Sequence, residues 1–202
     1  MTPGARIQSS IELLESIFIS WQSPKRFPAD KIIDQYFKSH RFVGSKDRAS
    51  IGELVYWCLR NKATLEWWLV TKLLGNFHAR GMVLTALMLR SDYTALQLQA
   101  ISQDSQYSLP KLTTPELARC EALLNVLTLP LSQREGEISA MPDHVRLNYP
   151  EWLDAKLRES FGDDFEAQVA ALNDQAHTDL RVNTLKTTRE DLLVGLKAEG
   201  FN

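Results

Sequence analysis

The 202-residue sequence has few of the features that mark secreted or membrane-spanning proteins. Its two cysteines, Cys58 and Cys120, cannot build a disulfide framework, and neither has a CxxC or histidine partner at metal-binding spacing. No apolar run approaches the ~18 residues that a membrane span needs, and the N-terminus lacks the charged-then-apolar order of a signal peptide. We therefore expect a cytoplasmic protein with no membrane partner.

Common catalytic and cofactor motifs are absent too: there is no GxGxxG, no P-loop, no GxSxG and no HExxH. The histidines stand without a cysteine or carboxylate at ligand spacing, so surface or structural roles are favoured for all four: His40, His78, His144 and His177. Both cysteines fall on apolar helix stripes, where a cysteine behaves as a small hydrophobic residue. We predict no metal site and no catalytic residue in this chain.

The net charge of −2 does not indicate a nucleic-acid-binding protein, but the charge is unevenly distributed. Residues 1–80 carry 12 Lys and Arg against 7 Asp and Glu, a net charge of +5. Residues 81–202 carry 11 against 18, a net charge of −7. This asymmetry is typical of a basic face on the first half, and chance scatter of surface charge is an equally good explanation.

Helical hydrophobic periodicity dominates the first 130 residues, which show no strand pattern. It predicts helices at about 3–20, 28–39, 45–60, 64–74, 78–90, 93–101 and 114–127. For 45–60 the expected N-cap is Ser45, and the expected buried face is Ile51, Leu54, Val55, Cys58 and Leu59. Gly75 is the expected left-handed C-cap of the fourth helix. Because amphipathic helices must bury their stripes against one another, we predict an all-α bundle for residues 1–130.

The composition changes after that bundle. From Leu129 to Tyr149 the chain has few apolar residues in sequence and contains Pro130, Gly136 and Pro142, which predicts a linker at 131–148. Residues 149–202 predict two helices, a period-two strand at 180–184, and a last helix opened by a capping box of Thr187 and Glu190. A single β–α unit leaves its sheet edge unpaired, so we expect this chain to be a truncated part of a longer protein.

Two stretches of the sequence resemble a known family. GSKDRASIGELVYWCLR at 44–60 resembles the central helix of the NusB-like domain that opens the Sun (Fmu) family of RNA 5-methylcytosine methyltransferases. YPEWLDAKLRESFG at 149–162 and LNDQAHTDLRVNTLKTTRED at 172–191 resemble the helix and strand that lead from that domain into the catalytic half. The resemblance implies an all-α NusB-like RNA-binding domain at 1–130, a linker at 131–148, and the truncated α/β start of the family's RRM-like pre-catalytic region at 149–202.

The resemblance also implies a function. The chain would be the N-terminal, substrate-positioning part of an S-adenosylmethionine-dependent rRNA cytosine-C5 methyltransferase. The family's catalytic cysteine and cofactor loop lie beyond position 202, so this segment is expected to bind no cofactor and to be inactive alone. The expected partners are small-subunit rRNA and the parent's own C-terminal methyltransferase domain, not DNA. The alternative is a NusB-type protein-interaction module, an antitermination-like adaptor without an enzymatic role.

Basic side chains near helix ends are the candidates for RNA contact. Ser45 to Arg48 combines positive charge with the exposed amides of a helix start, which suits a phosphate, although Asp47 counts against an anion there. The alternative is a solvated turn whose residues only cap helices. Basic residues of the second and third helices are expected to converge on one rim. The predicted RNA-binding residues are Lys38, Arg41, Lys46, Arg48, Arg60, Lys62, Arg181 and Asn183.

Two further features leave alternatives open. Arg181 and Asn183 share one side of the predicted strand, where they serve either RNA positioning or interdomain hydrogen bonding. The adjacent Trp67 and Trp68 cannot both face the core of an amphipathic helix, so one is expected to be half-exposed and able to stack on a base. Packing in the core or between domains is the favoured role for this pair.

Overall fold

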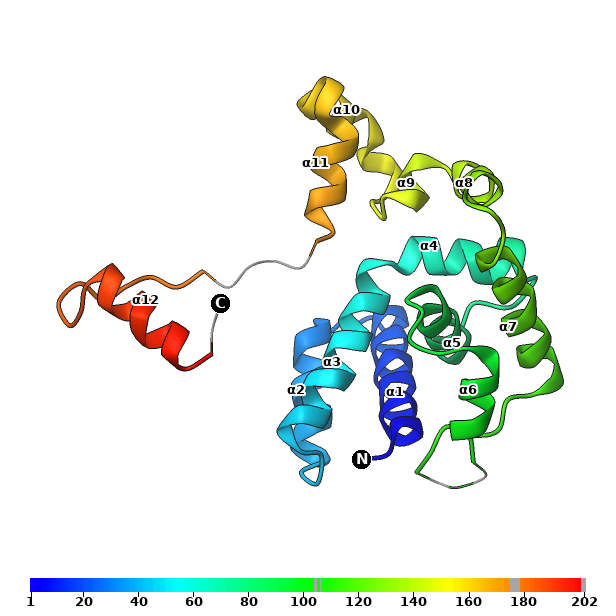
Figure 1. The fold of residues 1–202 in the computed structure, drawn as a ribbon, viewed down its shortest axis with the longest axis horizontal. Helices are drawn as coiled ribbons and strands as arrows, with labels where there is room; N and C mark the ends of the chain where they lie inside the picture. Colours follow the sequence, from blue (N-terminus) through cyan, green and yellow to red (C-terminus); the bar gives the residue numbers. More distant parts are fainter. Residues whose placement is uncertain (104, 106, 175–178, 201–202) are drawn as a thin grey trace.

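A computed structural model describes residues 1–103, 105, 107–174 and 179–200, and helices dominate these residues (Figure 1). The helices of the first part are, in chain order, α1 (Pro3–Gln22), α2 (Ala29–Ser39), α3 (Ser45–Arg60), α4 (Lys62–Trp67), α5 (Ala79–Leu89), α6 (Ala95–Ile101) and α7 (Thr114–Leu127). A π-helical turn, η1 (Trp68–Lys72), continues α4. The predicted all-helical character of the first 130 residues is confirmed for its described part.

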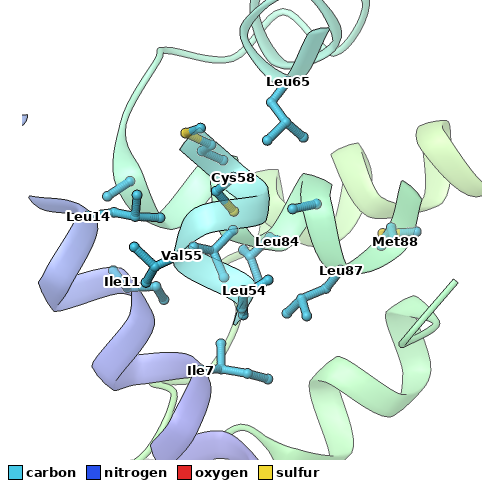
Figure 2. Packing of buried hydrophobic residues seen from close by; sticks show 14 of the residues in the cluster. Ile7, Ile11, Leu14, Leu54, Val55, Cys58, Leu65, Leu84, Leu87 and Met88 are labelled. Carbon is cyan, nitrogen blue, oxygen red and sulfur yellow. The ribbon is translucent and has the colours of Figure 1, made fainter. Parts of the chain in front are cut away.

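The core of this bundle lies where α1, α3 and α5 meet. Figure 2 shows Ile7, Ile11 and Leu14 of α1 facing Leu54 and Val55 of α3, with Leu84 and Leu87 of α5 beyond them. Four of the five residues predicted for the buried face of α3 are buried: Ile51, Leu54, Val55 and Cys58. Leu59 is only partly buried. Nine of the eleven residues of α5 are buried, because its apolar surface is covered by α1, α3, α4 and α7.

Two predicted helix caps are wrong by one residue. The N-cap of α3 is Gly44, and Ser45 is the first helical residue, with no side-chain cap bond. The left-handed residue after η1 is Leu74, with φ of 48°, rather than Gly75. Gly75 is required for close approach: an added Cβ would lie 3.0 Å from Leu69 Cδ1 and 3.1 Å from Arg119 Nε. The π-helical turn, which takes an extra residue, shifts the helix end relative to the sequence pattern.

The segment predicted as a linker contains two short helices, α8 (Leu131–Ser139) and α9 (Asp143–Arg146). Helix α9 packs against α4, where Thr64 Oγ1 donates a hydrogen bond of 2.8 Å to the carbonyl oxygen of Val145. Residues 131–148 are therefore largely helical and attached to the bundle at their end. The domain boundaries at 130 and 149 stay a prediction.

The last part begins with η2 (Glu151–Leu153), α10 (Asp154–Phe161), η3 (Gly162–Asp164) and α11 (Phe165–Leu172). These elements enclose a small second core of Leu147, Tyr149, Phe165 and Val169. Helix α12 (Arg189–Ala198) follows and lies away from the other helices (Figure 1). Residues 175–178, and His177 with them, lie outside the described residues.

Two predictions for this last part are not met. The described residues contain no strand, and residues 180–184 instead lead into a turn in which Asn183 O accepts from Lys186 N at 2.9 Å. A strand exists only through hydrogen bonds to a neighbour, and the described residues offer none. The N-cap of α12 is Thr188, which accepts from Asp191 N at 3.1 Å, so the capping box of Thr187 and Glu190 is wrong.

Candidate nucleic-acid interface

The predicted RNA-binding residues fall in three separate places. Lys38, Arg41, Lys46 and Arg48 lie at the turn between α2 and α3, which we call the α2–α3 turn (residues 38–48). Arg60 and Lys62 lie at the other end of α3, about 21 Å from Lys46 at 1.5 Å per helical residue. Arg181 and Asn183 lie beyond the undescribed residues 175–178. The expectation that the basic residues of the second and third helices share one rim is therefore wrong, while their RNA contacts stay a prediction.

The cations of the α2–α3 turn differ in what holds them. Arg41 and Lys46 are exposed, and neither forms an ion pair with any residue that the structure describes. Lys38 Nζ pairs with Asp34 at 2.7 Å on the surface of α2. Arg48 donates from Nε to the Val43 carbonyl oxygen at 2.8 Å, and its guanidinium lies 5.6 Å from the centre of the Phe37 ring. Arg41 and Lys46 can therefore reach a phosphate without breaking a contact, whereas the contacts of Arg48 stabilise the turn.

The acidic residue of this turn is already paired. Asp47 Oδ2 accepts from the N-terminal ammonium of Met1 at 2.9 Å, and Asp47 Oδ1 lies 3.4 Å from Arg6 NH1. The hydrogen bond from the ammonium group is the main reason why the pKa of Asp47 lies below its ordinary value. The N-terminal ammonium and Arg6 of α1 thus offset the charge of Asp47, which weakens the argument against an anion at the start of α3.

The second basic group, Arg60 and Lys62 at the end of α3, is less available for contact with RNA. Lys62 Nζ pairs with Glu66 at 2.8 Å and lies 4.7 Å from the centre of the Phe77 ring. Trp68 is buried, with 3% of its surface exposed, and its ring meets Trp67 edge-on. Trp67 is half-buried, with Lys72 Nζ 5.1 Å from its ring centre. Core packing is thereby confirmed for Trp68, and the expectation of one half-exposed tryptophan is met by Trp67.

An aromatic cavity beside the α2–α3 turn was not predicted from the sequence. It has a volume of about 760 Å³, and its lining includes Glu12 of α1, Tyr36 of α2, His40, Phe42 and Tyr107. The Tyr36 hydroxyl donates to Glu12 Oε2 at 2.9 Å, and the His40 ring stacks on the Tyr36 ring with centroids 4.0 Å apart. Burial, aided by the Glu12 carboxylate, raises the pKa of Tyr36 to about 12. The alternation of aromatic and basic residues in His40-Arg41-Phe42 was the available sequence signal.

Known proteins resemble this chain along most of its length. Residues 149–202 match the family model described as "Methyltr_RsmF/B-like, ferredoxin-like domain". Over 165 residues, the chain is 25% identical to ribosomal RNA small subunit methyltransferase B of Serratia proteamaculans, covering 79% of this chain and 38% of that protein. The protein of the same name from Pectobacterium carotovorum is 26% identical over 167 residues, covering 80% of this chain and 38% of the relative. These matches confirm the resemblance to the Sun (Fmu) family.

The chain spans about 38% of the length of these curated relatives. The family-model match includes Arg181 and Asn183. A ferredoxin-like domain is built around a β-sheet, but no strand is formed in the described part of residues 149–202, so their expected α/β character stays a prediction.

The two cysteines of the chain are buried in apolar surroundings. Burial raises the pKa of the Cys58 thiol to about 12 and that of Cys120 to about 11. Both thiols are therefore protonated at neutral pH, and neither has the thiolate character of a nucleophile. Residues 1–103, 105, 107–174 and 179–200 contain no group of three or more His, Cys, Asp or Glu side chains that could hold a metal ion.

That S-adenosylmethionine, implied by the family resemblance, binds outside this segment stays a prediction for the described residues. They form no strand followed by a glycine-rich turn, the arrangement that doubly wound folds use to hold nucleotide cofactors.

None of the described helices combines the length and apolar character that crossing a bilayer requires.

Proposed function

We propose that this chain is the RNA-binding, substrate-positioning part of an S-adenosylmethionine-dependent rRNA cytosine-C5 methyltransferase of the cytoplasm. Residues 1–130 would be its NusB-like domain, and the catalytic domain with its cofactor would lie outside residues 1–202. The observation that carries the proposal is the similarity, over 79–80% of the chain, to relatives named as small-subunit rRNA methyltransferases. The partners would be small-subunit rRNA and the parent's own methyltransferase domain, and this segment alone would be inactive.

The α2–α3 turn supports the RNA-binding part of the proposal. Arg41 and Lys46 are exposed cations, and the amides at the start of the 16-residue helix α3 add a partial positive charge. Asp47, the nearby carboxylate, is offset by Met1 and Arg6. Phosphate contacts of this kind fix the register of an RNA without reading its sequence.

A double variant, Arg41→Ala with Lys46→Ala, tests this role. The measurement is the affinity for a transcribed small-subunit rRNA fragment as a function of salt concentration. Each lost phosphate contact lowers the salt dependence of log K by about 0.7 for single-stranded RNA, so we expect a reduction of about 1.4 together with weaker binding. Arg48 is left unchanged, because its removal would also release the Val43 carbonyl oxygen.

The matched control is Arg26→Ala with Lys31→Ala. Both residues are exposed: Arg26 lies just before α2, and Lys31 lies in its first turn, about 10 Å along that helix from Lys38. The variant changes the net charge equally. We expect it to keep the wild-type salt dependence. Equal effects of the two double variants would show that overall charge, not this turn, attracts the RNA.

A second function is favoured by exposed apolar side chains near the end of the described chain. Leu180 is 61% exposed, Leu185 96% and Val194 71%. Such surfaces commonly pack against another domain or protein, which suits the protein-interaction alternative. A chain that gives no gel shift with rRNA at low salt, but binds the separately produced methyltransferase domain, would support this second function over the first.

A further inference from the structure

The aromatic cavity beside the α2–α3 turn has walls that nothing in the described chain covers. Phe42 is 73% exposed and Tyr107 is 75% exposed, although both line the cavity. Its volume of about 760 Å³ lies within the usual range for small-ligand sites. Large aromatic side chains left exposed around one hollow indicate a surface that accepts a flat, apolar group.

The stacking surface is held in place before anything binds. His40 Nδ1 lies 2.8 Å from the Tyr36 carbonyl oxygen and 3.1 Å from Ser39 Oγ, which fixes the ring that stacks on Tyr36. The Phe42 ring meets His40 edge-on, with centroids 5.7 Å apart. A fixed aromatic surface loses little conformational entropy when a ligand stacks on it.

Charge around the cavity favours a nucleotide over an apolar peptide. Arg41 lies between two lining residues, His40 and Phe42, and Lys46 begins the next helix. Residues 1–80, which supply nearly all of the lining, carry a net charge of +5. A base placed in the cavity would have its own phosphate beside these cations, the combination that single-strand-binding proteins use.

Glu12 gives the cavity hydrogen-bond acceptors. Its Oε1 accepts from Gln8 Nε2 at 3.1 Å, and its Oε2 accepts from the Tyr36 hydroxyl at 2.9 Å. A carboxylate has about four acceptor positions, so about two are left for a ligand. Cytosine, adenine and guanine carry an exocyclic amine that can donate to such a group, and uracil does not.

We propose that this cavity takes one unstacked base of single-stranded RNA and prefers a base with an exocyclic amine. The inference rests on the proposed RNA-binding function and adds to it the form of RNA that is bound. Duplex RNA cannot supply an unstacked base, so it would be held through its phosphates alone.

The test compares fluorescent oligo(C), oligo(U) and an RNA duplex, each of about 12 nucleotides, by anisotropy with the full 202-residue chain. The variants are Phe42→Ala and Tyr107→Ala, with Phe42→Trp as the conservative rescue. Each alanine variant should weaken single-strand binding about 5- to 150-fold and leave duplex binding and the salt dependence unchanged. The matched control is Trp152→Ala, which removes an aromatic side chain that is 72% exposed outside the cavity.

The outcomes separate this inference from the function on which it rests. If the wild-type chain binds neither single strand nor duplex at low salt, the proposed function fails and the inference with it. If the wild type binds RNA but the alanine variants bind as it does, or weaken both RNA forms equally, the cavity is not a base site and the function stands. If Phe42→Ala leaves RNA binding intact and weakens binding of the methyltransferase domain, the cavity holds protein.

The role of Glu12 is tested separately, by the ratio of the affinities for oligo(C) and oligo(U). Wild type should bind oligo(C) at least about 5-fold more tightly than oligo(U), and Glu12→Gln should reduce that ratio toward one. Equal wild-type affinity for the two oligonucleotides would overturn the assignment of Glu12 as the group that selects the base.

Discussion

Thr64 and Asn148 hydrogen-bond each other in both directions although 84 positions separate them. Thr64 N donates to Asn148 Oδ1 at 3.1 Å, and Asn148 Nδ2 donates to Thr64 Oγ1 at 2.9 Å. The hydroxyl of Thr64 then donates to the Val145 carbonyl oxygen at 2.8 Å. This pair satisfies a backbone amide at the start of α4 and joins that helix to the chain that leads into residues 149–174.

Replacing Asn148 should separate two contributions to stability. Asn148 has φ of 53°, a left-handed conformation that asparagine tolerates and alanine does not. Asn148→Gly should lose about 1–2 kcal/mol through its hydrogen bonds, and Asn148→Ala about 1 kcal/mol more through backbone strain. Urea unfolding followed by circular dichroism measures both. Equal losses in the two variants would mean that the backbone conformation contributes nothing.

The ion pair of Arg80 and Glu116 predicts an acid-dependent stability. Arg80 Nε donates to Glu116 Oε1 at 2.6 Å, and Thr113 N donates to Glu116 Oε2 at 2.8 Å. Burial alone raises the pKa of Glu116, but these hydrogen bonds outweigh it and bring the pKa below its ordinary value of 4.5. A lowered folded-state pKa gives stability that is full above about pH 4.5 and is lost as the pH falls through the folded-state value.

Glu116→Gln tests that linkage. The variant should cost about 1.5–3 kcal/mol at neutral pH, because a charge-assisted pair loses its charge. The gap between wild type and variant should narrow as the pH falls below about 4.5, since wild-type Glu116 then becomes neutral as well. Unfolding free energies at several pH values measure this gap, and a constant gap would rule out Glu116 as a source of acid sensitivity.

Two helical glycines should respond to alanine in opposite directions. A Cβ at Gly4 would lie 2.6 Å from Ser108 Oγ and 2.7 Å from the Ile101 carbonyl oxygen, so Gly4→Ala should destabilise the protein by about 1–3 kcal/mol. Gly52 on α3 has nothing within 4 Å of its added Cβ, so Gly52→Ala should stabilise by about 0.5–1 kcal/mol. Thermal and urea unfolding report both changes. Destabilisation by Gly52→Ala would show that α3 tolerates no extra side chain on that face.

The helices of the bundle were predictable because helical periodicity is a local property. Apolar residues at the spacing of Ile51, Leu54, Val55 and Cys58 allow one side of a helix to be buried, whichever element packs against it. Helix ends were less predictable. Adjacent residues compete for one cap position at Gly44 and Ser45, and again at Thr187 and Thr188. The two candidates differ in capping free energy by about 1 kcal/mol or less.

The candidate site was predictable only in part. The basic residues of the α2–α3 turn are close in sequence, so their proximity follows from the chain itself. The separation of Arg60 and Lys62 from them follows from the length of α3, which the sequence already implied. The aromatic cavity was not predictable, because Glu12, Tyr36 and Tyr107 come from three distant segments that only packing brings together.

The sequence by itself determined the helical character of the first 130 residues and the family resemblance, because both depend on patterns a few residues long. Only the tertiary structure decided which cations are unpaired, where Asp47 finds its partners, and that Thr64 meets Asn148. It also decided that residues 180–184 form no strand in the described chain. The physical reason is the same in each case. An ion pair needs a partner group, a cavity needs several walls and a strand needs a neighbouring strand, and the chain supplies these from distant positions or not at all.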